Sequence, residues 1–178
     1  MLFQFSILKN KDIYIINFHD LDIGEYDFKF ILDNVFFEKF DNSEIKDANI
    51  KAEVKLIKHQ HTFELDFDLS GFVTVQCDRC LDDFKQHVTY KTDLFVEFGE
   101  KSSDLSDADT RITIASNEIE IVLDKHLYDY AHLSIPYKNV HPDENKCNMS
   151  IINRIEELNT KQEEVSDPRW DKLKTLMN

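Results

Sequence analysis

Two long runs of alternating apolar residues, one on each side of a Cys-x-x-Cys motif, constrain the fold of this chain most strongly. Before the motif, the apolar residues share one parity: Phe63, Leu65, Phe67, Leu69, Val73 and Val75. After it, a second set alternates in the same manner: Phe84, Val88, Tyr90, Leu94, Val96 and Phe98. A period of two over such lengths predicts half-buried antiparallel strands. Cys77 and Cys80 are therefore predicted to lie at the tip of a β-hairpin.

The rest of the chain favours a strand-rich fold with little helix. Its 178 residues include 14 phenylalanines but only three glycines and three prolines, and aromatic side chains are enriched in strands. Shorter alternating segments occur at residues 3–7, 13–15, 26–32, 48–56, 112–114 and 119–123. We expect an α+β fold dominated by mostly antiparallel strands, barrel-like or a sandwich, with a few short helices.

Helical patterns are short and begin at recognisable capping residues. Asp33 or Asn34 suits the N-cap of a helix that ends near residue 40, and Asp124 suits the cap of one that ends before Pro136. Further helices are predicted at 151–158 and, with Trp170, from residue 167 onward. We expect a β-rich core domain over residues 1–136, which carries the hairpin, and an irregular segment over 137–178 that ends in a short helix.

A Cys-x-x-Cys motif has three interpretations that its spacing does not separate. The two thiols form half of a zinc site, a redox pair, or two small buried residues that pack a turn. A thioredoxin-type redox pair begins a helix after a strand, whereas a second strand follows Cys80 here. Zinc binding and simple packing therefore remain as the two main interpretations.

The formal charge of −14 limits how this chain can contact nucleic acid. Nonspecific binding to phosphates requires many lysines and arginines, so any RNA contact must be local. The most basic surface carries Lys51 and Lys55 on one strand face, with Lys58 at the turn that follows. These three lysines are the predicted RNA contacts, and the alternative is a solvated face that protects a sheet edge from aggregation.

Composition also sets expectations about compartment and activity. Three cysteines, an odd number, favour a reducing compartment, and we expect a cytoplasmic protein. No apolar run approaches the roughly 18 residues that a membrane span needs, so no membrane partner is expected. No nucleophile, phosphate-loop or metalloprotease motif is present, so we expect no enzyme and no small-molecule substrate. A hydrolase that uses Cys77 or Cys80 with a histidine is the remaining enzymatic alternative.

Several motifs, in their order along the second half of the chain, resemble those of the YceD family of large ribosomal RNA subunit accumulation proteins. They are Gly71 to Cys80 followed by Leu81 and Phe84, then Ile135-Pro136, and finally Asp167-Pro168-Arg169-Trp170 to Leu173-Lys174. The resemblance implies a non-enzymatic factor for the accumulation or processing of large-subunit ribosomal RNA. Its implied partner is ribosomal RNA or a ribosomal assembly protein. The alternative is an acidic adaptor with a zinc-knuckle-like hairpin and no RNA contact.

The resemblance also implies a second half for the zinc site. Many relatives carry a downstream Cys-x-x-Cys-Gly cluster, whereas the corresponding region here holds only Cys147, with His141 six residues earlier. A zinc site formed by Cys77, Cys80, His141 and Cys147 is one interpretation. The other is that His141 and Cys147 belong to a polar loop without a metal.

Overall fold

The computed structural model describes residues 14–41, 43, 45, 47–99 and 110–160. These residues form two compact units: residues 14–75 with 85–137, and residues 76–84 with 138–160. The hairpin tip thus clusters with the residues that follow 137, while the division into two domains at residue 136 stays a prediction. The predicted strand at 3–7 and the predicted helix from 167 lie outside the described residues.

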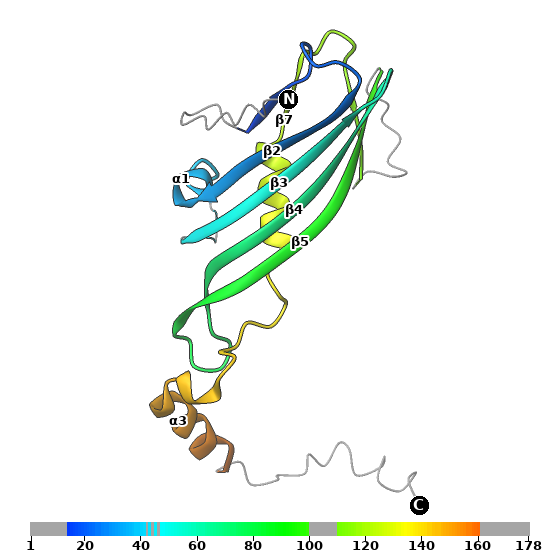
Figure 1. Ribbon diagram of the computed structural model, residues 1–178. Coiled ribbons are helices and arrows are strands. Elements are labelled where there is room, and N and C mark those ends of the chain that lie inside the picture. Colours follow the sequence, from blue (N-terminus) through cyan, green and yellow to red (C-terminus); the bar gives the residue numbers. More distant parts are fainter. Residues whose placement is uncertain (1–13, 42, 44, 46, 100–109, 161–178) are drawn as a thin grey trace, which may run out of the picture. The chain divides into compact units, whose positions relative to one another are not determined.

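The first unit is built on a five-stranded sheet with the order β2-β3-β4-β5-β6 (Figure 1). Its strands are β2 (Gly24–Asp33), β3 (Ala48–Lys58), β4 (Thr62–Gln76), β5 (Asp83–Phe98) and β6 (Arg111–Ile114). β3 pairs antiparallel with β2 and β4, whereas β6 is parallel to β5. A separate antiparallel pair joins β1 (Ile15–Asn17) to β7 (Glu120–Val122). The β-dominated α+β class is confirmed, but the described strands form an open sheet and no closed barrel.

The helices are α1 (Asn34–Phe37), α2 (Asp124–Leu133) and α3 (Met149–Thr160). The predicted cap of α1 is confirmed, because Asp33 Oδ1 accepts a hydrogen bond from the Phe36 N–H at 3.1 Å. The predicted cap of α2 is wrong: Leu123 occupies the N-cap position and makes no side-chain bond. Asp124 lies in the first turn instead, where its charge interacts favourably with the helix dipole. None of the described helices is long and apolar enough to span a membrane.

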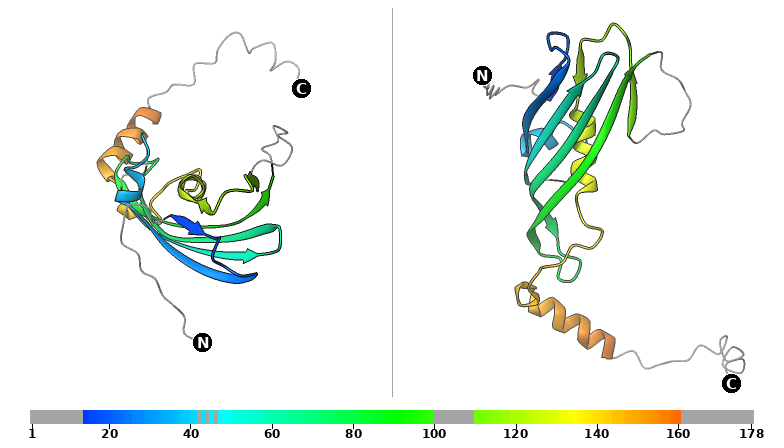
Figure 2. Two further views of the ribbon diagram at one scale, coloured as in Figure 1. Left: turned by 90° about the horizontal axis from the view of Figure 1, so that it is seen from above. Right: turned by 45° about the vertical axis from the view of Figure 1, so that its right-hand side comes forward.

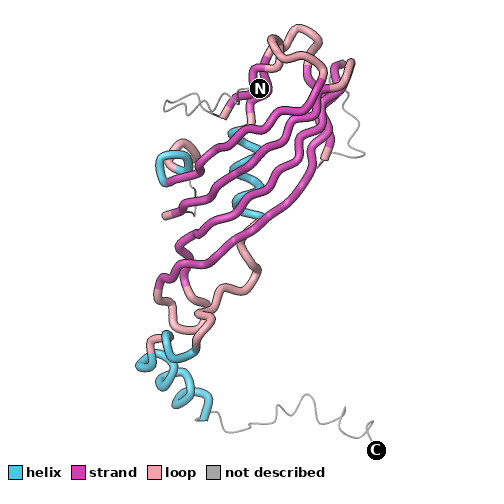
Figure 3. Tube along the Cα trace, viewed as in Figure 1, coloured by secondary structure: helices cyan, strands magenta, loops and turns pink. Residues whose placement is uncertain are grey.

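α2 packs against the inner side of the curved sheet (Figures 2 and 3). Its buried residues include Leu127 and Tyr130, and the Tyr130 ring meets Phe67 of β4 edge to face at 5.0 Å. Along β4 the buried residues share one parity, while the residues between them are wholly or partly exposed. The buried residues are Phe63, Leu65, Phe67, Leu69 and Val73. The alternation in the sequence is therefore the alternation between a face covered by α2 and an exposed face.

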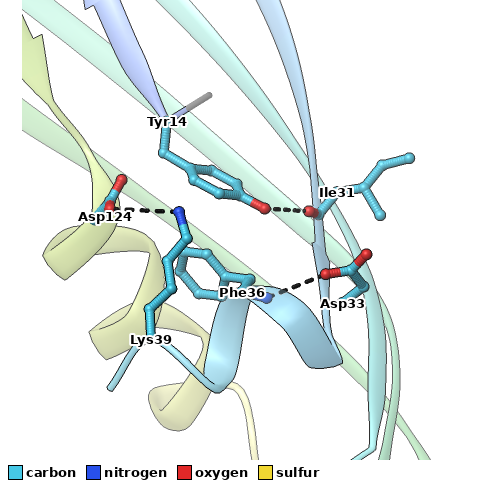
Figure 4. A network of polar contacts seen from close by, with 6 residues as sticks. All are labelled: Tyr14, Ile31, Asp33, Phe36, Lys39 and Asp124. Atoms are coloured by element: carbon cyan, nitrogen blue, oxygen red, sulfur yellow. Dashed lines mark hydrogen bonds and ion pairs between the residues drawn. The ribbon is translucent and has the colours of Figure 1, made fainter. Parts of the chain in front are cut away.

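A polar network connects Tyr14, which precedes β1, with β2, with α1 and the residues after it, and with the first turn of α2 (Figure 4). The Tyr14 hydroxyl donates a hydrogen bond to the Ile31 carbonyl at 2.7 Å. The Lys39 ammonium lies 4.7 Å from the Tyr14 ring centroid and 3.9 Å from Asp124. Burial, with the nearby charges of Asp33 and Asp124, raises the pKa of Tyr14 to about 12. Tyr14 therefore stays protonated near neutral pH and keeps its donated bond.

Candidate metal centre

The hairpin tip holds the first two donors of a Cys/His cluster. The Cys77 N–H donates to the Asp82 carbonyl at 2.9 Å, and the Leu81 N–H donates to the Cys77 carbonyl at 2.8 Å. Leu81 has a φ of 63°, a left-handed conformation that is uncommon for residues other than glycine. This tight turn leaves the side chain of Leu81 exposed while both Cys77 and Cys80 are fully buried.

The other two donors, His141 and Cys147, come from the segment that leads into α3. A single turn of 3₁₀ helix, Glu144–Lys146, separates them and brings Cys147 back toward the hairpin cysteines. Asn148 then caps α3, because its Oδ1 accepts a hydrogen bond from the Ser150 N–H at 3.2 Å. Local turn and cap chemistry thus sets the spacing between the histidine and the third cysteine.

The four donor atoms have the spacing of a tetrahedral metal site. All of them lie within 4.8 Å of one another. His141 Nδ1 is 3.6 Å from Cys80 Sγ and 3.6 Å from Cys147 Sγ. A tetrahedral ion with metal–sulfur bonds of about 2.3 Å and metal–nitrogen bonds of about 2.0–2.1 Å places sulfur and nitrogen about 3.6 Å apart. Cys77, Cys80, His141 and Cys147 therefore fit one metal ion.

Charge within this cluster also favours a cation. Burial alone would raise the pKa of Cys77, but hydrogen bonds from the backbone N–H groups of Arg79, Cys80 and His141 outweigh it and lower that pKa to about 6. Burial and the neighbouring Cys80 and Cys77 side chains raise the pKa of Cys147 to about 11. Three buried thiolates repel one another, and a bound cation stabilises all three together.

The cluster is enclosed by apolar side chains. His141 is 7% exposed and Cys147 is 5% exposed, and Phe84, Val140 and Ile152 pack against the cysteines. The Phe84 ring lies 4.6 Å from the His141 ring, centroid to centroid. An enclosed set of four protein donors leaves no position for water or substrate, which is typical of structural rather than catalytic metal sites.

Asp78 was missed by sequence reasoning, although it lies between the two hairpin cysteines. Its N–H donates to the Asn139 carbonyl at 2.7 Å, and its Oδ2 accepts a bond from the Asn139 N–H at 2.7 Å. This reciprocal pair fixes the backbone two residues before His141 to the hairpin tip. Its only signal in the sequence was its position inside the Cys-x-x-Cys motif.

We expect Asp78→Ala to weaken metal binding by about 10- to 100-fold, the usual effect of removing a residue that orients a metal ligand. Competition titration against a chromophoric chelator measures this change. Asp82→Ala is the matched control, because the bond that Asp82 makes in the turn uses its backbone carbonyl. Equal metal affinities of Asp78→Ala and the wild type would contradict the positioning role of Asp78.

The three lysines predicted to contact RNA do not share one environment. Lys51 is exposed on the sheet face opposite α2, and Lys55 lies on the same face, bound to a β2 glutamate at 2.7 Å. The Lys58 ammonium instead donates to two backbone carbonyls, at 2.8 Å to Phe18 and 2.6 Å to Leu21. The structure thus separates Lys58 from the other two, and RNA contact by these lysines stays a prediction.

Comparison with known proteins gives one family. The family model described as large ribosomal RNA subunit accumulation protein YceD matches residues 65–177, more than half of the chain. The matched range contains the whole Cys/His cluster. No curated protein and no solved structure matches the chain.

Proposed function

Because the chain belongs to the YceD family of large ribosomal RNA subunit accumulation proteins, we propose that it is a non-enzymatic factor in the accumulation or processing of large-subunit ribosomal RNA. The observation that carries this proposal is the family match over residues 65–177, which spans the complete Cys/His cluster. The proposed partner is ribosomal RNA or a ribosomal assembly protein. We place this role in the cytoplasm, where ribosomes assemble and thiols stay reduced.

We propose zinc as the metal held by Cys77, Cys80, His141 and Cys147. Three thiolates and one imidazole in a tetrahedral arrangement are a donor set typical of structural zinc. When bound, zinc supplies a cross-link and compensates the thiolate charges. The protein's own groups do the rest: Asp78 fixes the approach of the His141 segment, and Phe84 packs on the His141 ring.

The non-enzymatic part of the proposal rests on the enclosure of this centre. A catalytic metal site keeps a coordination position open for water or substrate. Here four protein donors fill a tetrahedron, and the side chains around them are apolar. The centre therefore suits the task of holding α3 and the hairpin tip in one rigid unit that a partner can recognise.

Isolation of the tagged full-length chain from growing cells, with RNA sequencing and mass spectrometry, tests the proposed function. We expect enrichment of large-subunit over small-subunit ribosomal RNA relative to a tag-only control. Depletion of the protein is expected to lower the ratio of large- to small-subunit RNA. Recovery of a basic protein without ribosomal RNA, together with an unchanged RNA ratio, would instead support the acidic adaptor. A net charge of −14 suits the binding of a basic partner protein.

A further inference from the structure

The exposed face of the sheet, opposite α2, changes in character along its strands. Around Lys55 this face is acidic. The hydrogen bond from Lys55 to Glu25 is the main cause that raises the pKa of Lys55, and the charges of Glu25, Asp27 and Asp66 raise it further. Farther along the same strands, toward the first residues of β3 and the last residues of β4, it carries a different set. Its cationic and aromatic residues are Lys51, Phe72, Lys85 and His87. It also has two exposed carboxylates: Asp83, beside Lys85, and Asp47, which accepts a hydrogen bond from the Thr74 hydroxyl.

Phe72 is the aromatic centre of this second part of the face. Its side chain is 50% exposed, and its ring meets His87 of β5 edge to face at 5.1 Å. On its other side, directly opposite Phe72 on β3, lies Asn49. Opposite Asn49 on β2 lies Asp33, whose carboxylate already accepts the hydrogen bond that caps α1. Phe72 is thus a half-exposed aromatic ring between two side chains that can form hydrogen bonds with a base.

Two lysines beside this ring keep their charges available. Lys51 of β3 and Lys85 of β5 are exposed on this face. Within the part of the chain that the structure describes, neither makes an ion pair, whereas Lys29, Lys55 and Lys91 of the same face are each bound to a carboxylate. An ammonium without a carboxylate partner is free to replace a counterion on a phosphate.

We propose that Phe72, His87, Lys51 and Lys85 form a contact surface for single-stranded RNA. The inference rests on the proposed function and deepens it, because it names the part of the molecule that meets the RNA. Single-stranded RNA is recognised by stacking of unpaired bases on aromatic side chains, with lysines along the backbone. A duplex offers no free base to stack, and the acidic part of the face repels a longer backbone contact. The surface therefore fits a short unpaired segment.

Fluorescence anisotropy of a labelled mixed-sequence single-stranded RNA with the full-length chain tests this surface. We expect Phe72→Ala to weaken binding about tenfold, the scale of losing one stacked base, and Phe72→Tyr to bind like the wild type. Lys51→Ala combined with Lys85→Ala should reduce the slope of log affinity against log salt by about 1.4, or about 0.7 for each phosphate that is no longer neutralised. Lys91→Ala is the matched control, because this lysine lies on the same face of β5 as Lys85 but is bound to Asp68.

Several results would overturn the surface. Equal affinity of Phe72→Ala and the wild type is one such result, and a loss of salt dependence in Lys91→Ala as large as in the double lysine variant is another. Tighter binding to the matching duplex than to the single strand would also overturn it, as would binding to a protein but not to the RNA. Should Phe72→Ala fail to fold by its circular dichroism melt, Phe72→Leu keeps the apolar bulk without the ring and is expected to show the same loss. Recovery of ribosomal RNA by both wild type and Phe72→Ala would leave the proposed function standing and refute the surface, whereas no recovery by wild type would refute the function itself.

Discussion

Replacing Cys80 by serine is expected to abolish metal binding and to unfold residues 138–160. Cys80 is fully buried, with its Sγ 3.6 Å from His141 Nδ1, and a serine hydroxyl is not a zinc donor near neutral pH. Among the described residues, three further apolar residues pack in the cluster around the cysteines: Phe84, Val140 and Ile152. So small a core cannot order this segment alone, whereas a structural zinc ion contributes about 10–16 kcal/mol in zinc-finger peptides.

Hydrogen exchange followed by mass spectrometry measures this effect. Backbone protection over residues 138–160 should fall in Cys80→Ser, and in wild type treated with a chelator, while protection of β3 and β4 stays. Leu81→Ala is the matched control in the same turn, because Leu81 is 59% exposed and supplies no donor. Unchanged protection of residues 138–160 in Cys80→Ser would show that the segment folds without metal.

Gly71→Ala is expected to destabilise the sheet by about 3 kcal/mol, the upper part of the usual range for overpacking. Gly71 pairs with Ile50, and a Cβ on it would lie 2.2 Å from the Asn49 carbonyl oxygen and 2.6 Å from the Ile50 Cα. Both are backbone atoms, so no side-chain rotation relieves the clash, and β3 must move away from β4.

Urea unfolding followed by far-ultraviolet circular dichroism measures the free energy of unfolding of this variant. Gly99→Ala is the matched control, because among the described residues its Cβ would meet just the Thr113 methyl group, at 3.2 Å. We expect Gly99→Ala to cost less than about 1 kcal/mol, since a methyl group at a flexible side-chain end can give way. Equal stabilities of the two variants would contradict the close approach of β3 and β4 at Gly71.

Local patterns predicted most of the elements. The strict alternation before Cys77 and after it indicated the long hairpin, because only a strand buries every second residue. The Asp33 cap was also predictable, since an aspartate before an apolar helix needs no distant partner. The cap of α2 was wrong by one residue, a difference that local patterns do not resolve. An open sheet with a parallel β6 was not predictable, because edge pairing depends on contacts far apart in the sequence.

The site was predictable only in part for the same reason. Cys77 and Cys80 are linked by their spacing, but the return of the His141 segment depends on the bond pair between Asp78 and Asn139, which no motif indicates. Lys58 shows the converse case. It was predicted at the turn after the strand, but it is the last residue of β3, and its ammonium donates to the carbonyls of Phe18 and Leu21, 40 and 37 residues earlier. Long-range polar contacts of this kind leave no periodic signal.

The metal content and coordination of the full-length chain, purified without chelator, test the Cys/His centre most directly. Elemental analysis combined with zinc X-ray absorption measures both on one sample. We predict about one zinc per chain, with three sulfur neighbours at about 2.3 Å and one nitrogen neighbour at about 2.0–2.1 Å. Freshly prepared protein without zinc, or zinc with oxygen neighbours in place of sulfur, would contradict a metal centre formed by Cys77, Cys80, His141 and Cys147.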